Sequence, residues 1–488
     1  MSLVREGAGQ EQPGREQPGR DQAGREQAGR ADRVGKRGSV GIDRTTWRAL
    51  RTELIRGTAP MAALSIAVAG GAMLFNETER WAGRWNPLAE YISVILFALL
   101  PLAAAAGAWQ AGRERRRRIG DLLDSTARPS GQPLVLAWAA VTLGAFAGLL
   151  LVWASGAVLV ARVATYGGRG WWLTLAVAFA GLAAAAAIGV AAGRLIPSRV
   201  VAPVIGLVVF VSMGMGSGTN GSGYTWLTPS MDWTGYGVEH VSTDARLLQL
   251  LWLAGLTVTV LVLVSSRRRW LVVAPAAAAI VAAAWLVNDT RDVGWQRDPA
   301  AAELVCTDDG GPEVCMTRVN AFLLEDAKGP VREQLARWEG IDGGFVRAVD
   351  STAHGHDPSS LPDGTAGLDL SWLVSWNGGL SEQNEYGETV QTSFASSAGG
   401  VVNRHCDLDG GEPSPEEQAV IWAGEIAYYW VLGDPDPVGM VLGEGENHEF
   451  QTLLAKPEVE QKDWLSRYMM AARSCDTDMF AALVRELQ

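Results

Sequence analysis

Cysteine and lysine are scarce in this chain of 488 residues, and its long apolar runs contain almost no charge. All four cysteines lie after residue 305, and lysine occurs at positions 36, 328, 456 and 462. Within the apolar runs, Glu90 carries the one charge, near the end of its run. Ion-coupled transporters and proton pumps keep ionisable groups inside their spans for coupling, so the sequence argues against both classes.

A phosphate-binding loop is also missing. Such a loop needs a glycine cradle for the phosphates, then a lysine, then a Ser or Thr that binds magnesium. The candidate pair Gly35-Lys36 is followed by Arg37, and Arg30 stands where the first glycine is required. We therefore expect that this chain is not an enzyme by itself and has no cofactor, and that any ATP and magnesium bind in a partner subunit.

Charge is divided unevenly along the chain. From Asp289 onward there are 36 acidic and 13 basic residues, whereas the preceding part has 17 acidic and 28 basic residues. The acidic second part argues against nucleic acid as a partner. We divide the chain into a cytoplasmic tail (residues 1–42), a membrane domain (43–287) and an extracytoplasmic domain (288–488).

The tail contains a five-residue repeat from Glu11 to Arg30, Glu-Gln-Pro-Gly-Arg and close variants, with no apolar face. This composition is typical of disorder, and we expect no signal peptide because the first long apolar run begins near residue 59. The next segment, Asp43 to Arg56, places Trp47 and Leu50 on one side of a helix. It is predicted either to lie on the inner membrane surface or to extend the first span.

Seven apolar runs follow, each near the length that a bilayer requires. They cover residues 59–75, 87–109, 133–161, 171–192, 200–215, 247–264 and 270–287, and the fifth is the shortest. Arginines at 113–118, 194, 199 and 267–269 occupy alternate loops, which predicts a cytoplasmic N-terminus. Seven spans then place residues 288–488 outside. The predicted fold is a polytopic α-helical protein of the plasma membrane.

Small residues are frequent within these runs. Gly144 and Gly148 form a small-xxx-small pair, and residues 181–193 are almost all small. Such helices pack closely against one another or against a second copy, although the overall Ala and Gly bias explains the pattern as well. The loop 217–245 combines aromatic residues with Gly, Ser and Thr. It either dips back into the outer interface or forms an ordinary loop.

The segment Arg113 to Pro129 follows the second run, and five of its first six residues are arginines. With the surface helix before the first run and the aromatic loop after the fifth, this segment resembles a permease subunit of the type-2 exporter class of ABC transporters. That family typically has six spans, and the segment after its second span is a cytosolic coupling helix. The matching residues here are Glu114 or Arg118, Gly120, Leu122, Leu123, Ser125, Thr126 and Pro129.

The resemblance implies several partners and a transport role. The coupling helix would dock on a separate P-loop ATPase, and the spans would pair with a second copy or a related permease subunit within the lipid bilayer. The composition, rich in Ala and Arg and poor in Lys, suggests a bacterium with a GC-rich genome, so a drug, an antibiotic or a modified peptide is the expected cargo. The expected fold is a six-span permease-like bundle plus a seventh span.

The last 200 residues are expected to form a mixed α/β, mostly helical domain with disulfides. Cysteines on the oxidising side of a membrane favour disulfides, and we prefer the pairs Cys306–Cys315 and Cys406–Cys475 over a four-thiolate zinc site. Helices are predicted over residues 319–338, split by Pro330, and over 414–432, 464–472 and 476–487. A strand is predicted over 368–376.

Catalytic and metal-binding signals in this domain are weak. His354, His356 and Asp357 could hold a metal, but their Gly-, Ser- and Pro-rich loop favours solvated residues. We therefore predict no catalytic residues and no metal site. Two other classes stay open beside the permease: a membrane-anchored extracytoplasmic sensor or interaction protein, and a polytopic enzyme with its active site at the outer face.

Overall fold

The computed structural model describes most of the chain from Arg44 onward. The described residues are 44–116, 131–196, 198–217, 223–230, 237–266, 268–289, 294–355, 360–404, 406, 414–433 and 448–488. Residues 52–488 form one compact unit, whose boundary falls inside the first described helix, α2 (Arg44–Arg56). The segment predicted as a surface helix is thus helical, and its place on a membrane stays a prediction.

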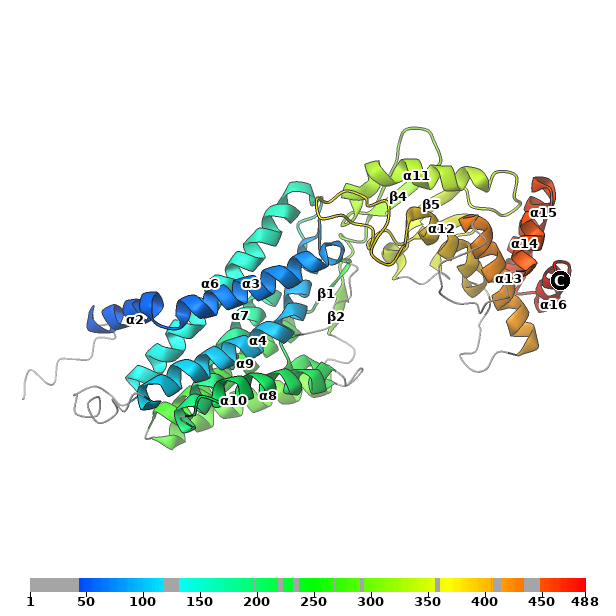
Figure 1. Cartoon of the computed structure of the whole chain (residues 1–488). Helices are drawn as coiled ribbons and strands as arrows, with labels where there is room; N and C mark the ends of the chain where they lie inside the picture. The colour runs from blue at the N-terminus through cyan, green and yellow to red at the C-terminus, as the bar shows by residue number, and fades with distance from the viewer. Residues whose placement is uncertain are drawn as a thin grey trace, which may run out of the picture. The chain divides into compact units, whose positions relative to one another are not determined.

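Within the described ranges, seven apolar helices follow α2, one for each apolar run of the sequence (Figure 1). They are α3 (Ala59–Asn76), α4 (Trp85–Arg116), α6 (Gln132–Val163), α7 (Trp171–Leu195), α8 (Val201–Ser217), α9 (Thr243–Ser265) and α10 (Val273–Asp289). Among the described residues, six helices are long and apolar enough to cross a membrane, whereas α8, with 17 residues, is shorter. These helices indicate a polytopic membrane protein.

The central contacts of the bundle are made by small residues. A Cβ added to Gly189 of α7 would lie 1.9 Å from the carbonyl oxygen of Ala104 in α4. Likewise, a Cβ on Gly144 of α6 would lie 2.4 Å from the carbonyl oxygen of Ala59 in α3. Only glycine permits backbones to approach this closely. The small residues therefore pack helices of this chain against each other.

The arginine-bearing helix ends lie together. Near the ends of α4 and α7, Gly193 packs directly on the backbone of Ala108. The end of α9 meets the start of α6, where a Cβ on Gly131 would lie 2.7 Å from the carbonyl oxygen of Ser265. We call this the arginine end of the bundle, since it is flanked by Arg113, Arg194 and Arg269. The opposite end, which contacts the C-terminal domain, is called the domain end.

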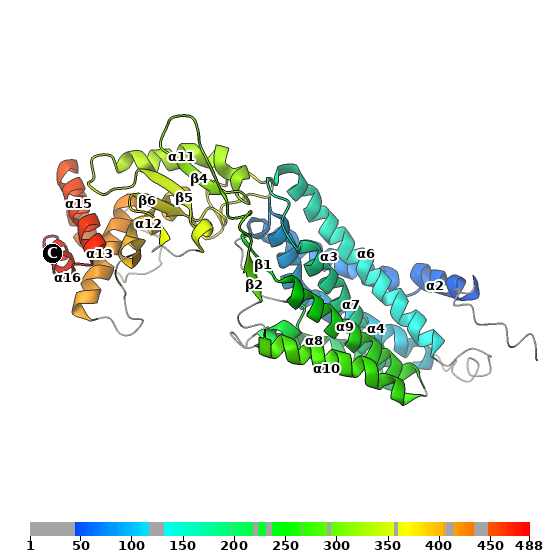
Figure 2. The ribbon, with the colours of Figure 1, turned by 180° about the vertical axis from the view of Figure 1, so that it is seen from behind.

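The short helix α8 runs from the arginine end to the domain end. Its Gly206 lies against Pro101 and its Gly214 against Phe97, so α8 is antiparallel to α4. The following helices α9 and α10 lie side by side and return the chain to the domain end (Figure 2). The arginine end and the C-terminal domain therefore lie at opposite ends of the bundle.

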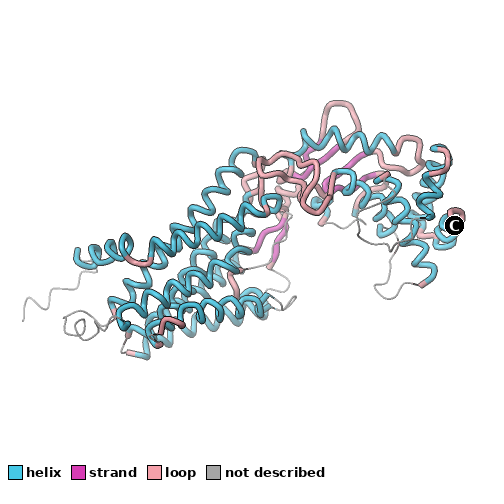
Figure 3. Tube along the Cα trace, viewed as in Figure 1, coloured by secondary structure: helices cyan, strands magenta, loops and turns pink. Residues whose placement is uncertain are grey.

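The C-terminal domain is built on a small sheet with helices around it (Figure 3). Its strands are β3 (Leu304–Cys306), β4 (Val314–Thr317), β5 (Arg347–Asp350) and β6 (Thr365–Leu368), in that order. β3 pairs antiparallel with β4, and the other pairs are parallel. A separate two-stranded sheet joins β1 (Glu239–Val241) to β2 (Trp295–Arg297).

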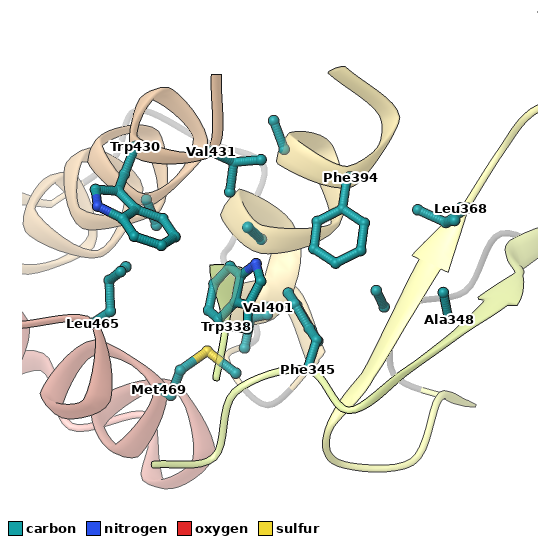
Figure 4. Close-up of a cluster of buried hydrophobic side chains, with 14 of the residues drawn as sticks. Trp338, Phe345, Ala348, Leu368, Phe394, Val401, Trp430, Val431, Leu465 and Met469 are labelled. Atoms are coloured by element: carbon teal, nitrogen blue, oxygen red, sulfur yellow. The ribbon is translucent and has the colours of Figure 1, made fainter. Parts of the chain in front are cut away.

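Helices supply most of the domain core. They are α11 (Leu324–Arg337), α12 (Val390–Gly399), α13 (Pro415–Leu432), α14 (His448–Leu454), α15 (Glu458–Ser474) and α16 (Thr477–Arg485). Four aromatic rings meet at the centre, with the Trp338 ring 4.6 Å from Phe345 and 5.6 Å from Trp430 (Figure 4). Phe394 of α12 completes this group and has no exposed surface. The residues form a continuous core between the sheet and the helices.

Two expectations for this domain are wrong in detail. Pro330 does not split its helix, because it removes one hydrogen bond from α11 while buried Ala327 and Val331 hold the helix on the core. The strand predicted over 368–376 lies earlier and ends at Leu368. The Asp369 carboxylate accepts hydrogen bonds from the amide and hydroxyl of Ser371, which turns the chain after the strand.

Other expectations agree with the structure. Ser414 caps α13 through a capping box with Glu417, as its sequence predicts. Asp476 accepts a hydrogen bond from the amide of Met479 and caps α16. Both preferred cysteine pairs are present as the disulfides Cys306–Cys315 and Cys406–Cys475.

Candidate functional site

The predicted coupling residues fall mainly outside the described part of the chain. Glu114 lies in the last turn of α4. The remaining residues lie outside the described ranges: Arg118, Gly120, Leu122, Leu123, Ser125, Thr126 and Pro129. What the structure describes is therefore the end of the helix that leads into this segment.

A polar cluster stands one turn before Glu114. The Gln110 side chain donates a hydrogen bond from Nε2 to the Glu53 carboxylate over 2.7 Å and accepts one from the Thr58 hydroxyl over 2.9 Å. Gln110 is buried, so both bonds are shielded from competing solvent. This cluster joins the chain before α3 to the arginine end of α4. The sequence alone does not reveal this cluster, because Gln110 directly follows an apolar run.

The loop between α8 and α9 enters the bundle. Its described part, residues 223–230, is called the re-entrant segment here. Pro229 lies against Gly181 of α7, and its carbonyl oxygen accepts a 2.6 Å hydrogen bond from Ser93 of α4. Ser93 is the ninth residue of α4, about 12 Å along that helix from the domain end. The loop therefore folds in between α4 and α7, and its place at the outer membrane interface stays a prediction.

Side chains of the bundle bind the backbone of the re-entrant segment. Gln249 donates a 3.0 Å hydrogen bond to the carbonyl of Trp226, and the indole of Trp252 donates one to the carbonyl of Leu227. The hydroxyl of Thr228 donates a 2.6 Å bond to the carbonyl of Ser230. Residues 223–227 form a short 3-10 helix, and the carbonyls at its end need partners outside that helix. The segment is thus held in place from α4, α7 and α9.

Buried charge surrounds the domain end of α4. Arg84, directly before this helix, is 1% exposed and donates hydrogen bonds to the carbonyls of Glu79 (2.8 Å) and Ser371 (3.0 Å). Burial lowers the pKa of Arg84 to about 10, while Asp369, Asp350 and Glu90 oppose that shift. The guanidinium therefore stays charged at neutral pH. It links the bundle directly to the C-terminal domain.

The carboxylates facing Arg84 are fixed by hydrogen bonds. Asp350, at the end of β5, is 1% exposed and accepts hydrogen bonds from Thr317, Asn320 and Thr352. A buried carboxylate with this many donors is held in one position. The end of β5 thereby presents a rigid negative charge toward Arg84.

A second buried arginine extends the network to α9. Arg246, in the first turn of α9, interacts electrostatically with Glu90 of α4 and donates a 2.9 Å hydrogen bond to Gln249. Gln249 in turn holds the re-entrant segment. We name the whole set the charge network: Arg84, Glu90, Arg246, Asp350 and Asp369. It connects α4, α9, the re-entrant segment and the C-terminal domain.

A further polar contact ties the loop between α6 and α7 to the strand pair β1–β2. The Tyr166 hydroxyl donates a 2.6 Å hydrogen bond to Asp298, which is buried directly after β2. Burial, together with this bond to a carboxylate, raises the pKa of Tyr166 to about 12. Desolvation lowers the pKa of the neighbouring His240. The contact holds the domain end in a fixed arrangement.

Metal-type ligands come together at one place among the described residues. Cys306, Cys315 and Glu313 lie within 4.8 Å of one another, but the two sulfurs are joined in a disulfide and offer no thiolate. His354 is described, and burial lowers its pKa, whereas His356 and Asp357 lie outside the described residues. The disulfide leaves Cys306 and Cys315 without the thiolates that a metal would need, and the set His354, His356 and Asp357 stays untested.

The charge network was missed by the sequence analysis. Arg84 and Arg246 stand just beside apolar runs, where arginines commonly reach out to the membrane surface. A signal was available, because Arg84 lies between Trp81 and Trp85 and is followed by an acidic residue, Glu90, inside the run. The arrangement can transmit movement, because α4 runs from the domain end to the arginine end of the bundle. No protein-family model, no curated protein and no solved structure matches this chain.

Proposed function

We propose that this protein is a permease subunit of an ATP-driven exporter. In this proposal α4 couples movement at the arginine end of the bundle to movement at the domain end. The observation that carries the proposal is the position of α4. It has 32 residues, about 48 Å, with Glu90 of the charge network near one end and Gln110 near the other. It packs on α3, α6, α7 and α8. A displacement of the arginine end of α4 would therefore also displace the helices that pack on it.

The partner of the arginine end is proposed to be a separate P-loop ATPase. The segment from Arg113 to Pro129 would dock on that ATPase, which would supply the ATP and magnesium. Closure of the ATPase would press on α4, and α4 would shift the re-entrant segment through Ser93 and the charge network through Glu90. Movement of the re-entrant segment would then open and close the path at the domain end.

The proposed topology places the arginine end in the cytoplasm. Basic clusters beside spans stay on the cytoplasmic side, and disulfides form on the oxidising side. Both rules agree if α8 crosses as a seventh span. Its 17 residues, about 26 Å, are at the short limit for a bilayer, and it runs between the two ends of the bundle. The C-terminal domain would then be extracytoplasmic.

Co-purification tests the proposal. The chain is purified from its native membrane in mild detergent, and co-eluting proteins are identified by mass spectrometry. We expect a stoichiometric P-loop ATPase with the wild type and none with Leu122→Arg. A matched control is Val200→Arg, which adds the same charge at an exposed position near the arginine end. Equal retention of the ATPase by Leu122→Arg would refute the docking site, and no ATPase in any detergent would refute the permease role.

The second candidate function is that of a sensor. The buried bond from Arg84 to Ser371 favours it, because a ligand that moves the C-terminal domain would also move α4. The signal would then pass from the C-terminal domain to the arginine end of the bundle, opposite to the direction proposed for the permease. The two functions differ in turnover: in vesicles with the co-purified partners, a permease moves cargo only when ATP is hydrolysed, whereas a sensor moves no cargo.

A further inference from the structure

A tight turn of the C-terminal domain displays a tryptophan. Val374 and Leu380 form an antiparallel bridge, and the amide of Ser375 donates a 2.9 Å hydrogen bond to the carbonyl of Gly379. Trp376, next to the start of this turn, is 63% exposed. A large apolar ring held at a turn in this way is costly to leave in water.

The turn is rigid and carries no charge. The Asn377 side chain accepts a 3.1 Å hydrogen bond from the amide of Gly379, and the amide of Leu380 donates to Asp326 of α11. Gly378 has φ +85°, a left-handed conformation that glycine adopts without strain. Between Ser375 and Leu380 every residue is uncharged. The turn thus holds the indole in a fixed position, with the Asp326 carboxylate against its Gly379–Leu380 side.

The turn lies at the domain end of the bundle. The backbone of Gly378 packs on Val163, the last residue of α6, so closely that an added Cβ would lie 2.5 Å from a Val163 methyl group. In the same loop, Trp372 has Arg80 at 5.6 Å over its ring, and Ser371 accepts the hydrogen bond from Arg84. Three contacts therefore fix this loop to the ends of the apolar helices.

The length of α6 sets the depth of the turn. With 32 residues α6 is about 48 Å long, whereas the hydrocarbon core is about 30 Å thick and the bilayer with headgroups about 40–45 Å. A centred, untilted α6 would extend about 9 Å beyond each face of the hydrocarbon core, which would bring Val163 to the outer edge of the headgroups. Trp172, in the first turn of α7 at the same end, is also exposed. Tryptophan is enriched at this level, because its ring is apolar and its N–H is polar.

We propose that Trp376 inserts into the headgroup region of the lipid bilayer and anchors the C-terminal domain to the membrane surface. The ligand of this surface is the lipid interface itself, and no specific lipid is required. Residues 375–380 bring no charge of their own to the acyl boundary. The anchor rests on the membrane-spanning role of α6 and goes beyond the proposed exporter function.

Depth measurement by spin labelling tests the anchor. All four native cysteines are in disulfides, so Trp376→Cys adds a single free thiol to the full chain. The labelled protein is placed in lipid nanodiscs, and relaxation by oxygen is compared with relaxation by a water-soluble nickel complex. We expect the label at position 376 to be several-fold more protected from nickel than a label in Met470→Cys, an exposed site on α15. Equal nickel access at both sites would overturn the anchor.

A third label separates the anchor from the topology. Val208→Cys, exposed on α8, should give the strong oxygen and weak nickel effects of the hydrocarbon core. If the label at position 208 is as accessible to nickel as a label in water, then α8 does not span the membrane. If the label at position 208 is protected from nickel and the label at position 376 is not, then the membrane anchor is refuted while the spanning role of α8 is supported.

A label-free comparison guards against disulfide exchange in the cysteine variants. Wild type and Trp376→Phe are compared in bilayers with lipids brominated near the headgroups. The wild type is expected to show an additional quenched tryptophan component that the variant lacks. Identical quenching in the two proteins would overturn the anchor.

Discussion

The closest contacts of the helical bundle differ from the centre of the C-terminal domain core. In the bundle, Gly189 brings the backbone of α7 against Ala104 of α4. In the domain, Trp338, Phe345 and Phe394 fill the space between sheet and helices. Lipid is as apolar as a side chain, so spans gain stability from close contact, whereas burial of large rings from water stabilises the domain.

The largest effect is expected from filling the closest contact of the bundle. Gly189→Leu must push α7 away from α4, because even its Cβ would lie 1.9 Å from a carbonyl oxygen. We expect a destabilisation of more than about 3 kcal/mol and loss of the monodisperse peak in detergent size-exclusion chromatography. The control is Gly71→Leu in α3, where no atom lies within 4 Å of the added Cβ. Equal behaviour of both variants would contradict this packing.

The opposite change should damage only the domain. Trp338→Ala removes a ring that is 2% exposed at the centre of the core, which costs about 3–5 kcal/mol. Protease resistance of residues 300–488 should fall, while the bundle keeps its elution volume. Trp376→Ala serves as control, because its ring is exposed and its loss in detergent should be nearly neutral. A uniform loss in both parts would show that they do not fold separately.

The link between the two parts is tested by Arg84→Met. The variant leaves the carbonyl of Ser371 without its donor and removes the cation that faces Asp350 and Asp369. We expect a loss of about 3 kcal/mol in thermal unfolding of the detergent-solubilised protein. Arg318→Met, which removes a surface ion pair with Glu303, should cost less than about 1 kcal/mol. Equal losses of stability in Arg84→Met and Arg318→Met would show that the charge network does not link the two parts.

The smallest effect is expected in the re-entrant segment. Ser93→Ala removes one hydrogen bond to the carbonyl of Pro229, worth about 1 kcal/mol in a membrane protein. Hydrogen exchange of residues 223–230 should increase with little change in overall stability. Ser155→Ala, whose hydroxyl bonds within its own helix, is the control. Unchanged exchange in Ser93→Ala would show that α4 does not hold the segment.

The sequence predicts the helices of the bundle well, because apolar runs of membrane length have few alternatives to a helix. It also predicts α13, whose start at Ser414 carries a local signal. It predicts the position of β6 wrongly and predicts a break in α11 at Pro330 that the structure does not show. Tertiary packing decides the bounds of both elements. Arg84 and Arg246 could not be identified as buried, since their partners come from distant segments. The predicted coupling residues after Arg116 lie beyond the described part of α4 and stay a prediction.

The central claim is that α4 passes the state of a cytoplasmic ATPase to the C-terminal domain. Hydrogen exchange of residues 369–373, which include Ser371, the hydrogen-bond partner of Arg84, tests it most directly in bilayers that contain the co-purified partner. The account predicts that ATP changes exchange there in the wild type and not in Leu122→Arg. Unchanged exchange in the wild type while the partner hydrolyses ATP would contradict the coupling.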